Sequence, residues 1–475
     1  MTSLGDPALL RYIGQLLVTG ATGAAIWYAY RWLHARNRAA AIVFALGLLA
    51  RFAVGLFLVV SWYVTAPAAS WTQADPRWFP DAIGYYSNAS LAADHGLGLV
   101  DIASSTYPAV LAVWLKLVGN VPAAPLFLNV LLYAVAAVVI VWPFSKEESA
   151  ADPIPAAVMM AGFAFSPILI LLSVQPLKDA LFIAAVMLAA IGLWLLLRRA
   201  CESPDSDRPG GLTRGLLATA IGVFVLSGIR AYFGVMILGI VTGVLGIWLL
   251  QQKRRTLARF MSLAVAIVAC IWLATSTGGG VYYDALAEPV VTPVKEALAA
   301  MLPSAQANAV TAKPESMPQM IQRFRRGFEE GGGASSFSQP ATSVARRDGW
   351  LPKIKALTIG LAAIFVPITL VRSTGALWFE GGRGLLFATD IDTIVLDATI
   401  LCCLIVVWRR RNALPNKAYA LYAIVLAAAA TGLIGYIVTN FGTLFRLRLM
   451  AAAPLWLLPM ALAQKVPDAT PSYKA

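Results

Sequence analysis

A carboxylate followed by two tyrosines is the first group of side chains in this sequence with the means to do chemistry. Asp81 lies between two long apolar stretches, and Tyr85 and Tyr86 follow it at the fourth and fifth positions. On a helix, Tyr85 shares the face of Asp81. The carboxylate can take a proton from a hydroxyl nucleophile; the alternative is that it caps the start of its own helix. His95 closes the segment as a further polar candidate, with a solvated helix end as its alternative.

Cationic side chains at three later places can bind an anion. Lys178-Asp179 opens an apolar stretch, Arg230 separates two others, and Arg446 and Arg448 precede the last one. Arginine suits bidentate binding of phosphate. For each cation alone, the alternative is anchoring at lipid headgroups. Together they favour a ligand that carries phosphate.

The composition indicates that membrane helices position these side chains. Of the 475 residues, 59% are hydrophobic and 13% are charged, whereas a soluble domain has roughly 25% charged residues. Apolar stretches of about 20 residues match the thickness of a bilayer and lack the alternation of a membrane barrel. The net charge of +13 comes from short basic clusters beside these stretches. That pattern belongs to membrane topology and argues against nucleic acid as a partner.

The expected fold is an all-α polytopic membrane protein with about 11–12 transmembrane helices. The apolar stretches cover residues 8–30, 40–66, 122–144, 154–174, 179–198, 212–228, 231–251, 260–275, 389–407, 418–438 and 447–464. Basic clusters at 31–38, 198–214, 253–259 and 409–411 place the N-terminus outside and the C-terminus inside. Asp81, Lys178, Arg230 and Arg446 then all reach the external face.

The same topology divides the chain into four regions. These are an extra N-terminal helix (1–38), a transmembrane core with an external loop at 67–120 (39–276), an external lid (277–388) and C-terminal membrane helices with a short cytoplasmic tail (389–475). Within the lid, 317–328 has the spacing of an amphipathic helix at the headgroups. The apolar stretch 354–371 contains Pro367, and counting it as a span would put 409–411 on the wrong side. We therefore expect residues 354–388 to be re-entrant or interfacial on the external face.

Several short motifs along the chain resemble those of a known family. They are Asp81…Tyr85…Ala89, Tyr107-Pro108 leading to Gly119, Asn129 after Pro125, Lys178-Asp179, and Arg446-Leu447-Arg448. In this order they resemble the membrane-embedded glycosyltransferases of the C superfamily, which include protein O-mannosyltransferases and the aminoarabinose transferases of lipid A. The resemblance covers residues 81–240 and, more loosely, the last helix. The chain departs from the pattern in its extra first helix and in Ala82, where many members have Glu.

The resemblance implies an enzyme of the bacterial inner membrane with its active site on the periplasmic side. The donor would be a polyprenyl-phosphate-linked sugar, and the acceptor a hydroxyl group of a glycan, a lipid or a protein. Asp81 would act as the base of an inverting displacement. The expected phosphate-binding and substrate-binding residues are Tyr85, Tyr86, His95, Lys178, Asp179, Arg230, Arg446 and Arg448. The resemblance also leaves room for a divalent cation, Mg²⁺ or Mn²⁺, between Asp81 and the phosphate.

Two other functions fit the same composition. A transporter or flippase for a lipid-linked sugar is one, although such proteins tend to have internal repeats and the sequence shows none. An O-antigen-type polymerase or ligase is the other. Those enzymes hold arginines in a large late external loop, and Arg323, Arg325 and Arg326 keep that alternative open.

Overall fold

The computed structural model describes residues 7–65, 78–95, 106–144, 153–201, 210–230, 232–234, 236–241, 243, 350–373, 383–438 and 441–463. All regular elements in these ranges are helices. Within the described ranges, six helical segments are long and apolar enough to cross a membrane, or seven if one bent pair counts as a span. The protein is therefore an all-α polytopic membrane protein, as the sequence predicts. The expected stretch 260–275, most of 231–251 and the amphipathic segment 317–328 lie outside the described residues.

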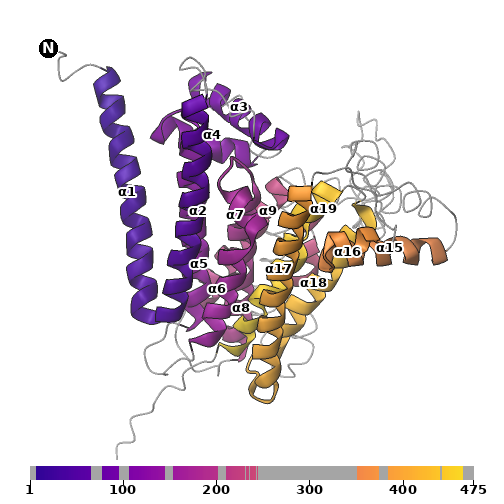
Figure 1. Cartoon of the computed structure of the whole chain (residues 1–475). Helices are drawn as coiled ribbons and strands as arrows, with labels where there is room; N and C mark the ends of the chain where they lie inside the picture. Colours follow the sequence, from indigo (N-terminus) through magenta and orange to yellow (C-terminus); the bar gives the residue numbers. More distant parts are fainter. Residues whose placement is uncertain are drawn as a thin grey trace, which may run out of the picture.

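The six long segments follow the expected apolar stretches closely. They are α2 (Arg38–Thr65), α5 (Ala124–Val141) with the short η3 (Trp142–Phe144), α8 (Asp179–Cys201), α17 (Arg383–Arg409), α18 (Lys417–Ile437), and a last span made of α19 (Phe441–Leu447), α20 (Leu449–Leu457) and η7 (Leu458–Leu462). The helix α9 (Gly210–Ile229) packs along α8. The extra N-terminal helix is α1 (Pro7–Arg36), which forms a hairpin with α2 at the edge of the bundle (Figure 1).

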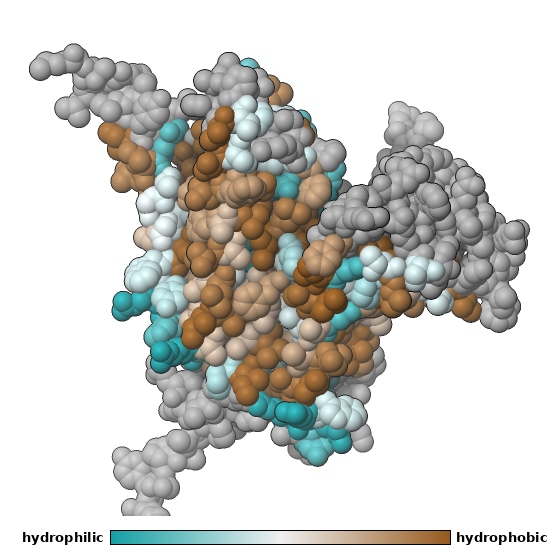
Figure 2. Space-filling view, in the orientation of Figure 1, coloured by the Kyte–Doolittle hydropathy of each residue, from teal (hydrophilic) through white to brown (hydrophobic). Residues whose placement is uncertain are grey.

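The two ends of the bundle differ in polarity and in structure. The turn between α1 and α2 and the turn between α17 and α18 lie at one end, while α3 (Pro80–His95) and α4 (Thr106–Val118) lie at the other, which we call the α3 end (Figure 1). Figure 2 shows a broad hydrophobic surface along the bundle and hydrophilic residues at the end opposite α3. The basic residues Arg36, Arg38 and Arg409 belong to that opposite end, in agreement with the segregation of positive charge on which the expected topology rests.

One expected span is broken. The stretch 154–174 consists of α6 (Ile154–Phe165) and α7 (Pro167–Ser173), whose axes differ by 62°. Pro167 has no N–H and disfavours helical geometry in the residue before it, so α6 ends at this point. Ser166 has extended backbone geometry and caps α7, its Oγ accepting a hydrogen bond from Leu169 N at 3.3 Å. The expectation of one continuous helix is therefore wrong.

Charged side chains from other helices satisfy both ends of this break. Arg51, which is 1% exposed, donates to Phe163 O at 2.7 Å and to Ala164 O at 3.2 Å, two carbonyls in the last turn of α6. Asp392 accepts from Ile168 N at 2.7 Å at the start of α7. A cation thus meets the negative end of one helix dipole, and an anion meets the positive end of the next.

The segment 354–371 is two short helices, α15 (Trp350–Phe365) and α16 (Ile368–Ser373), separated at Pro367. In Figure 1 α15 runs across the direction of the bundle helices instead of along it. It meets α18 where Gly360 faces Gly435, near the end of α18 that lies toward α3, and a Cβ on Gly360 would overlap the carbonyl of Gly435. α15 therefore does not run parallel to the spans, and its interfacial position stays a prediction.

Candidate functional site

The start of α3 is held against the turn that precedes α8. Phe79 O accepts from Ala82 N and Ile83 N and so begins α3, while Phe79 N donates to Gln175 Oε1 at 2.9 Å. Gln175 O in turn accepts from Asn129 Nδ2 at 2.7 Å. Asp81 is thereby placed over the turn that carries the Lys178-Asp179 pair.

Asp81 pairs with an arginine from the far end of the chain. Its Oδ2 accepts from Arg446 Nη1 at 2.6 Å, and its side chain is 57% exposed. Within the described residues this is the hydrogen bond that the carboxylate makes; it accepts none from the backbone N–H groups of α3. The helix-cap alternative for Asp81 is therefore wrong.

Asp179 is the buried centre of the cluster. It stands at the first position of α8 and is 1% exposed. Its Oδ1 accepts from Arg230 Nη2 at 2.6 Å, and its Oδ2 accepts from Arg446 Nε at 2.8 Å. The N-terminal end of α8 also favours a negative charge there. Arg446 consequently bridges one exposed and one buried carboxylate.

Lys178 and Tyr85 form one side of this cluster. Lys178 Nζ donates to Ile229 O at 3.3 Å and lies 5.7 Å from the centre of the Tyr85 ring. Burial, followed by the repulsion of Arg230 and Arg446, lowers the pKa of Lys178 to about 8. Burial also raises the pKa of the Tyr85 hydroxyl above its ordinary value. Tyr85 thus remains a neutral side chain beside the charged groups.

The cluster has an excess of positive charge and unused donors. Asp81 and Asp179 face the three cations Lys178, Arg230 and Arg446. Within the part of the chain that the structure describes, the buried atoms Arg230 Nη1 and Arg446 Nη2 have no hydrogen-bond acceptor. Buried donors are rarely left unpaired. An anionic group that accepts from both guanidinium groups would satisfy them and neutralise the excess charge.

Three expected site residues lie apart from this cluster. Tyr86 is 1% exposed, and its hydroxyl donates to Asn120 Oδ1 at 3.2 Å. His95 is exposed at the end of α3, with its Nδ1 3.2 Å from Leu91 O. Arg448 binds Asp392 and donates to Thr393 Oγ1 at 2.7 Å, so it supports the broken helix and not the cluster.

Two polar residues, one beside the cluster and one at the broken helix, were not singled out for a role from the sequence. Gln175 fixes the start of α3 with its side chain and holds Asn129 with its carbonyl. Asp392 sits inside an apolar stretch and joins Ser166, Ile168 and Arg448. Each is a polar residue in or beside a membrane helix, which by itself marks a structural or functional role.

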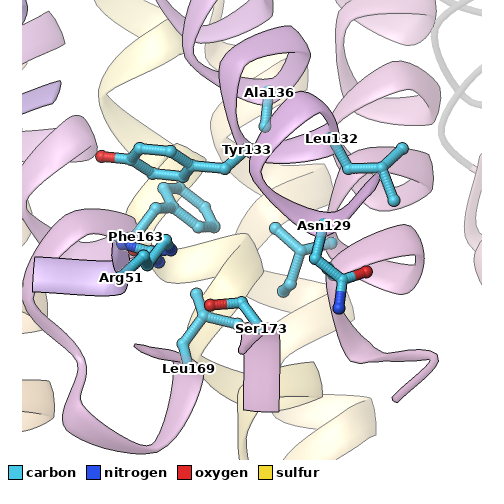
Figure 3. A pocket seen from close by; sticks show the side chains of 10 residues that line it. Arg51, Asn129, Leu132, Tyr133, Ala136, Phe163, Leu169 and Ser173 are labelled. Carbon is cyan, nitrogen blue, oxygen red and sulfur yellow. The ribbon is translucent and has the colours of Figure 1, made fainter. Parts of the chain in front are cut away.

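A small cavity lies in the bundle interior beside the turn that precedes α8. Its volume is about 20 Å³, and its lining includes Arg51, Asn129, Tyr133 and Ser173 (Figure 3). A space of this size holds about one water molecule. Arg51 stacks on the Tyr133 ring at 4.0 Å, so the cavity joins the broken helix to Asn129.

The cluster does not suit a divalent cation. Among the described residues, no group of three or more His, Cys, Asp or Glu side chains is placed to hold a metal ion. Both oxygens of Asp179 and one oxygen of Asp81 already accept from arginines. Mg²⁺ and Mn²⁺ require several oxygen ligands, and three nearby cations oppose a fourth. We therefore derive no step through a metal.

Comparisons with protein-family models, with curated proteins and with solved structures found no match. The function is accordingly argued from the charges and geometry of the cluster.

Proposed function

We propose that the protein is a membrane glycosyltransferase that moves a sugar from a polyprenyl-phosphate donor to an acceptor hydroxyl. One observation supports this above the others. Arg446 and Arg230 share the buried Asp179, and each retains a buried donor that has no acceptor in the described part of the chain, beside the half-exposed Asp81. The motif order that resembles the C-superfamily glycosyltransferases adds to it.

The cluster suits an inverting displacement. Asp81 Oδ2 is occupied by Arg446, and Oδ1 has no hydrogen bond within the described residues, so Oδ1 is free to take the proton of the acceptor hydroxyl. The acceptor oxygen attacks the anomeric carbon as the bond from that carbon to the phosphate oxygen breaks. The phosphate leaves with the electron pair and keeps its lipid chain.

The cations stabilise that leaving group. Arg230 Nη1 and Arg446 Nη2 offer buried donors to the phosphate oxygens, and Lys178 adds a third charge. Negative charge on the leaving oxygen grows in the transition state, which is where such groups accelerate the reaction. Asp179 is a positioning residue in this scheme, because it orients both guanidinium groups.

We further propose that the α3 end faces the periplasm of a bacterial inner membrane. The opposite end carries the basic residues Arg36, Arg38 and Arg409 to Arg411, which suit the cytoplasmic side. The lipid-linked donor would then reach the cluster from the outer leaflet.

The variant Asp81→Asn tests the role of the base, with Asp94→Asn on the same helix as its matched control. Asp94 is exposed and accepts from Asn120 at 3.0 Å. Release of prenyl phosphate is followed in proteoliposomes supplied with a panel of prenyl-phosphoryl hexoses and pentoses and an extract of native envelope glycans, lipids and proteins as acceptor. We expect Asp81→Asn to lose about 10²–10⁴-fold in rate and Asp94→Asn to keep the rate. Full activity of Asp81→Asn would contradict the assignment.

The broken helix raises a second candidate function, transport of a lipid-linked sugar. Transporters commonly bind their substrates at the ends of discontinuous helices, and α6 and α7 form such a pair. Movement of a fluorescent prenyl-phosphoryl sugar between leaflets of proteoliposomes, with no covalent product, would favour transport. The O-antigen-type alternative rests on arginines 323, 325 and 326, which lie outside the described residues.

A further inference from the structure

Two neutral polar side chains beside the charged cluster each have a buried polar atom that forms no hydrogen bond of ordinary geometry within the described residues. Tyr107, on α4, is 1% exposed, and its hydroxyl forms no hydrogen bond of ordinary geometry within the described residues. Asn129, on α5, is fully buried. Asn129 Nδ2 donates to Gln175 O at 2.7 Å, whereas Asn129 Oδ1 accepts no hydrogen bond within the described residues.

The surroundings place these two groups next to each other and next to the cluster. The Tyr107 ring packs edge-on against Tyr85, with 5.7 Å between ring centres, and Tyr85 lies under Lys178. Burial raises the pKa of the Tyr107 hydroxyl, and the Asn129 side chain, which lies within hydrogen-bonding range of that hydroxyl, opposes the rise; Asp179, Tyr85 and Arg446 have smaller influences. Tyr107 therefore carries a neutral hydroxyl that can donate one hydrogen bond and accept others.

The chemistry of this pair differs from that of the arginines. A phosphate can only accept hydrogen bonds, so it would leave Asn129 Oδ1 unpaired. A ligand hydroxyl can donate to Asn129 Oδ1 and accept from the Tyr107 hydroxyl. Buried polar atoms are nearly always paired, and two unpaired atoms of complementary type next to two unpaired guanidinium donors indicate one ligand with both phosphate and hydroxyl groups.

We propose that Tyr107 and Asn129 form a hydroxyl-binding subsite for the sugar of the phosphate ester, and that they contribute to sugar specificity. The proposal rests on the proposed function, because it assigns the phosphate of the same ligand to Arg230 and Arg446. In this arrangement the phosphate binds at the arginines and a sugar hydroxyl binds between α4 and α5. The competing occupant is an ordered water molecule, which would have the same hydrogen-bonding capacity.

The variant Tyr107→Phe tests the subsite, because it removes the hydroxyl and keeps the ring. The control is Tyr422→Phe on α18, whose hydroxyl is also buried and unpartnered within the described residues. Affinity is measured by calorimetry in detergent for farnesyl phosphate and for the tightest-binding member of a panel of farnesyl-phosphoryl hexoses and pentoses. Thermal stability is measured without ligand.

We expect Tyr107→Phe to bind farnesyl phosphate within about twofold of the wild type and to bind the sugar ester about tenfold more weakly. Its unliganded stability should equal that of the wild type or exceed it, because the lost hydroxyl has no partner. Tyr422→Phe should leave both affinities unchanged. Arg446→Gln should weaken both ligands, since both carry the phosphate.

Three results would overturn the subsite. Equal affinity of wild type and Tyr107→Phe for the sugar ester would mean that the hydroxyl binds only water. An equal loss for both ligands would place Tyr107 at the phosphate, and a large loss of unliganded stability would make its hydroxyl structural. In each case Arg446 could still bind prenyl phosphate and the proposed function would stand. If the wild type binds neither ligand, the proposed function fails and the subsite fails with it.

Discussion

Replacement of Asp179 by Asn should destabilise the protein strongly, because it removes the carboxylate on which two arginines converge. Arg230 is 5% exposed, and within the described residues Asp179 is its carboxylate partner. Arg446 keeps its second partner, Asp81, at 2.6 Å. The variant therefore leaves Arg230 as a buried charge without a counter-ion and Arg446 with an exposed one.

The magnitude follows from what is left unpaired. Removing one member of a buried ion pair costs about 3–5 kcal/mol, mostly because the remaining charge is still desolvated. The exposed pair between Asp81 and Arg446 is worth at most about 1 kcal/mol. Asp81→Asn should accordingly have a small effect on stability, whereas Asp179→Asn should lose about 3–5 kcal/mol. Adding Arg230→Met to Asp179→Asn should recover about 1–3 kcal/mol, since it removes the orphaned charge.

The measurement is reversible unfolding by SDS in mixed micelles, followed by tryptophan fluorescence, for the single variants and the double variant. A loss below about 1 kcal/mol for Asp179→Asn would mean that Arg230 is not held as a desolvated charge. Strict additivity in the double variant would mean that the two side chains do not interact. Either result would refute the reasoning about the buried centre of the cluster.

Two further predictions concern Lys178 and the crosswise helix α15. The pKa of Lys178 falls from 10.5 to about 8, so the unfolded chain binds the extra proton between those values and stability rises with pH across that window. Farnesyl phosphate should bind more weakly as the pH rises through the same range, because Lys178 loses its positive charge. Lys178→Met should abolish the pH dependence of both stability and affinity. Unfolding and calorimetric binding measured as a function of pH will test this. Gly360→Ala should destabilise the protein by about 1–3 kcal/mol, because the added Cβ would overlap the carbonyl of Gly435. Gly432→Ala is the control and should not destabilise it, because the space around Gly432 is open. Equal stability of the two variants in SDS unfolding would contradict the contact between α15 and α18.

Much of the fold was predictable, because a stretch of about 20 apolar residues is itself the signal for a span. The break at Ser166 was missed, although Pro167 is visible in the sequence. A proline inside an apolar stretch can kink a helix or end it, and the outcome here depends on remote partners. Arg51 and Asp392 supply those partners from α2 and α17, and no local pattern connects them.

The expected membrane topology predicts which residues share one face of the membrane, but not which of them are in contact. Topology placed Asp81, Arg230 and Arg446 on one face, and the structure brings them together around Asp179. The topology could not distinguish Arg446, which joins the cluster, from Arg448, which does not. Residues two apart on a helix do not face the same way, so one guanidinium group reaches Asp179 and the other reaches Asp392.

The same geometry separates the expected residues of α3. Tyr85 is four positions after Asp81 and lies over the cluster beside Lys178, whereas Tyr86 turns toward Asn120. His95 is 14 positions after Asp81, which is about 21 Å along a helix. Distance along α3 alone therefore removes His95 from a site centred on Asp81.

The broken helix bears on the choice between transfer and transport. A transporter needs the ends of a discontinuous helix to be available to its substrate. Here Arg51 occupies the carbonyl end of α6, and Asp392, itself neutralised by Arg448, occupies the N–H end of α7. With both ends satisfied by buried side chains, the break serves to aim α7, and with it Gln175 and the Lys178-Asp179 turn, at the start of α3. A fixed turn of this kind preorganises charges for a chemical step, whereas alternating access would require the buried pairs to separate at a cost of several kcal/mol. The geometry of the break therefore favours the transferase.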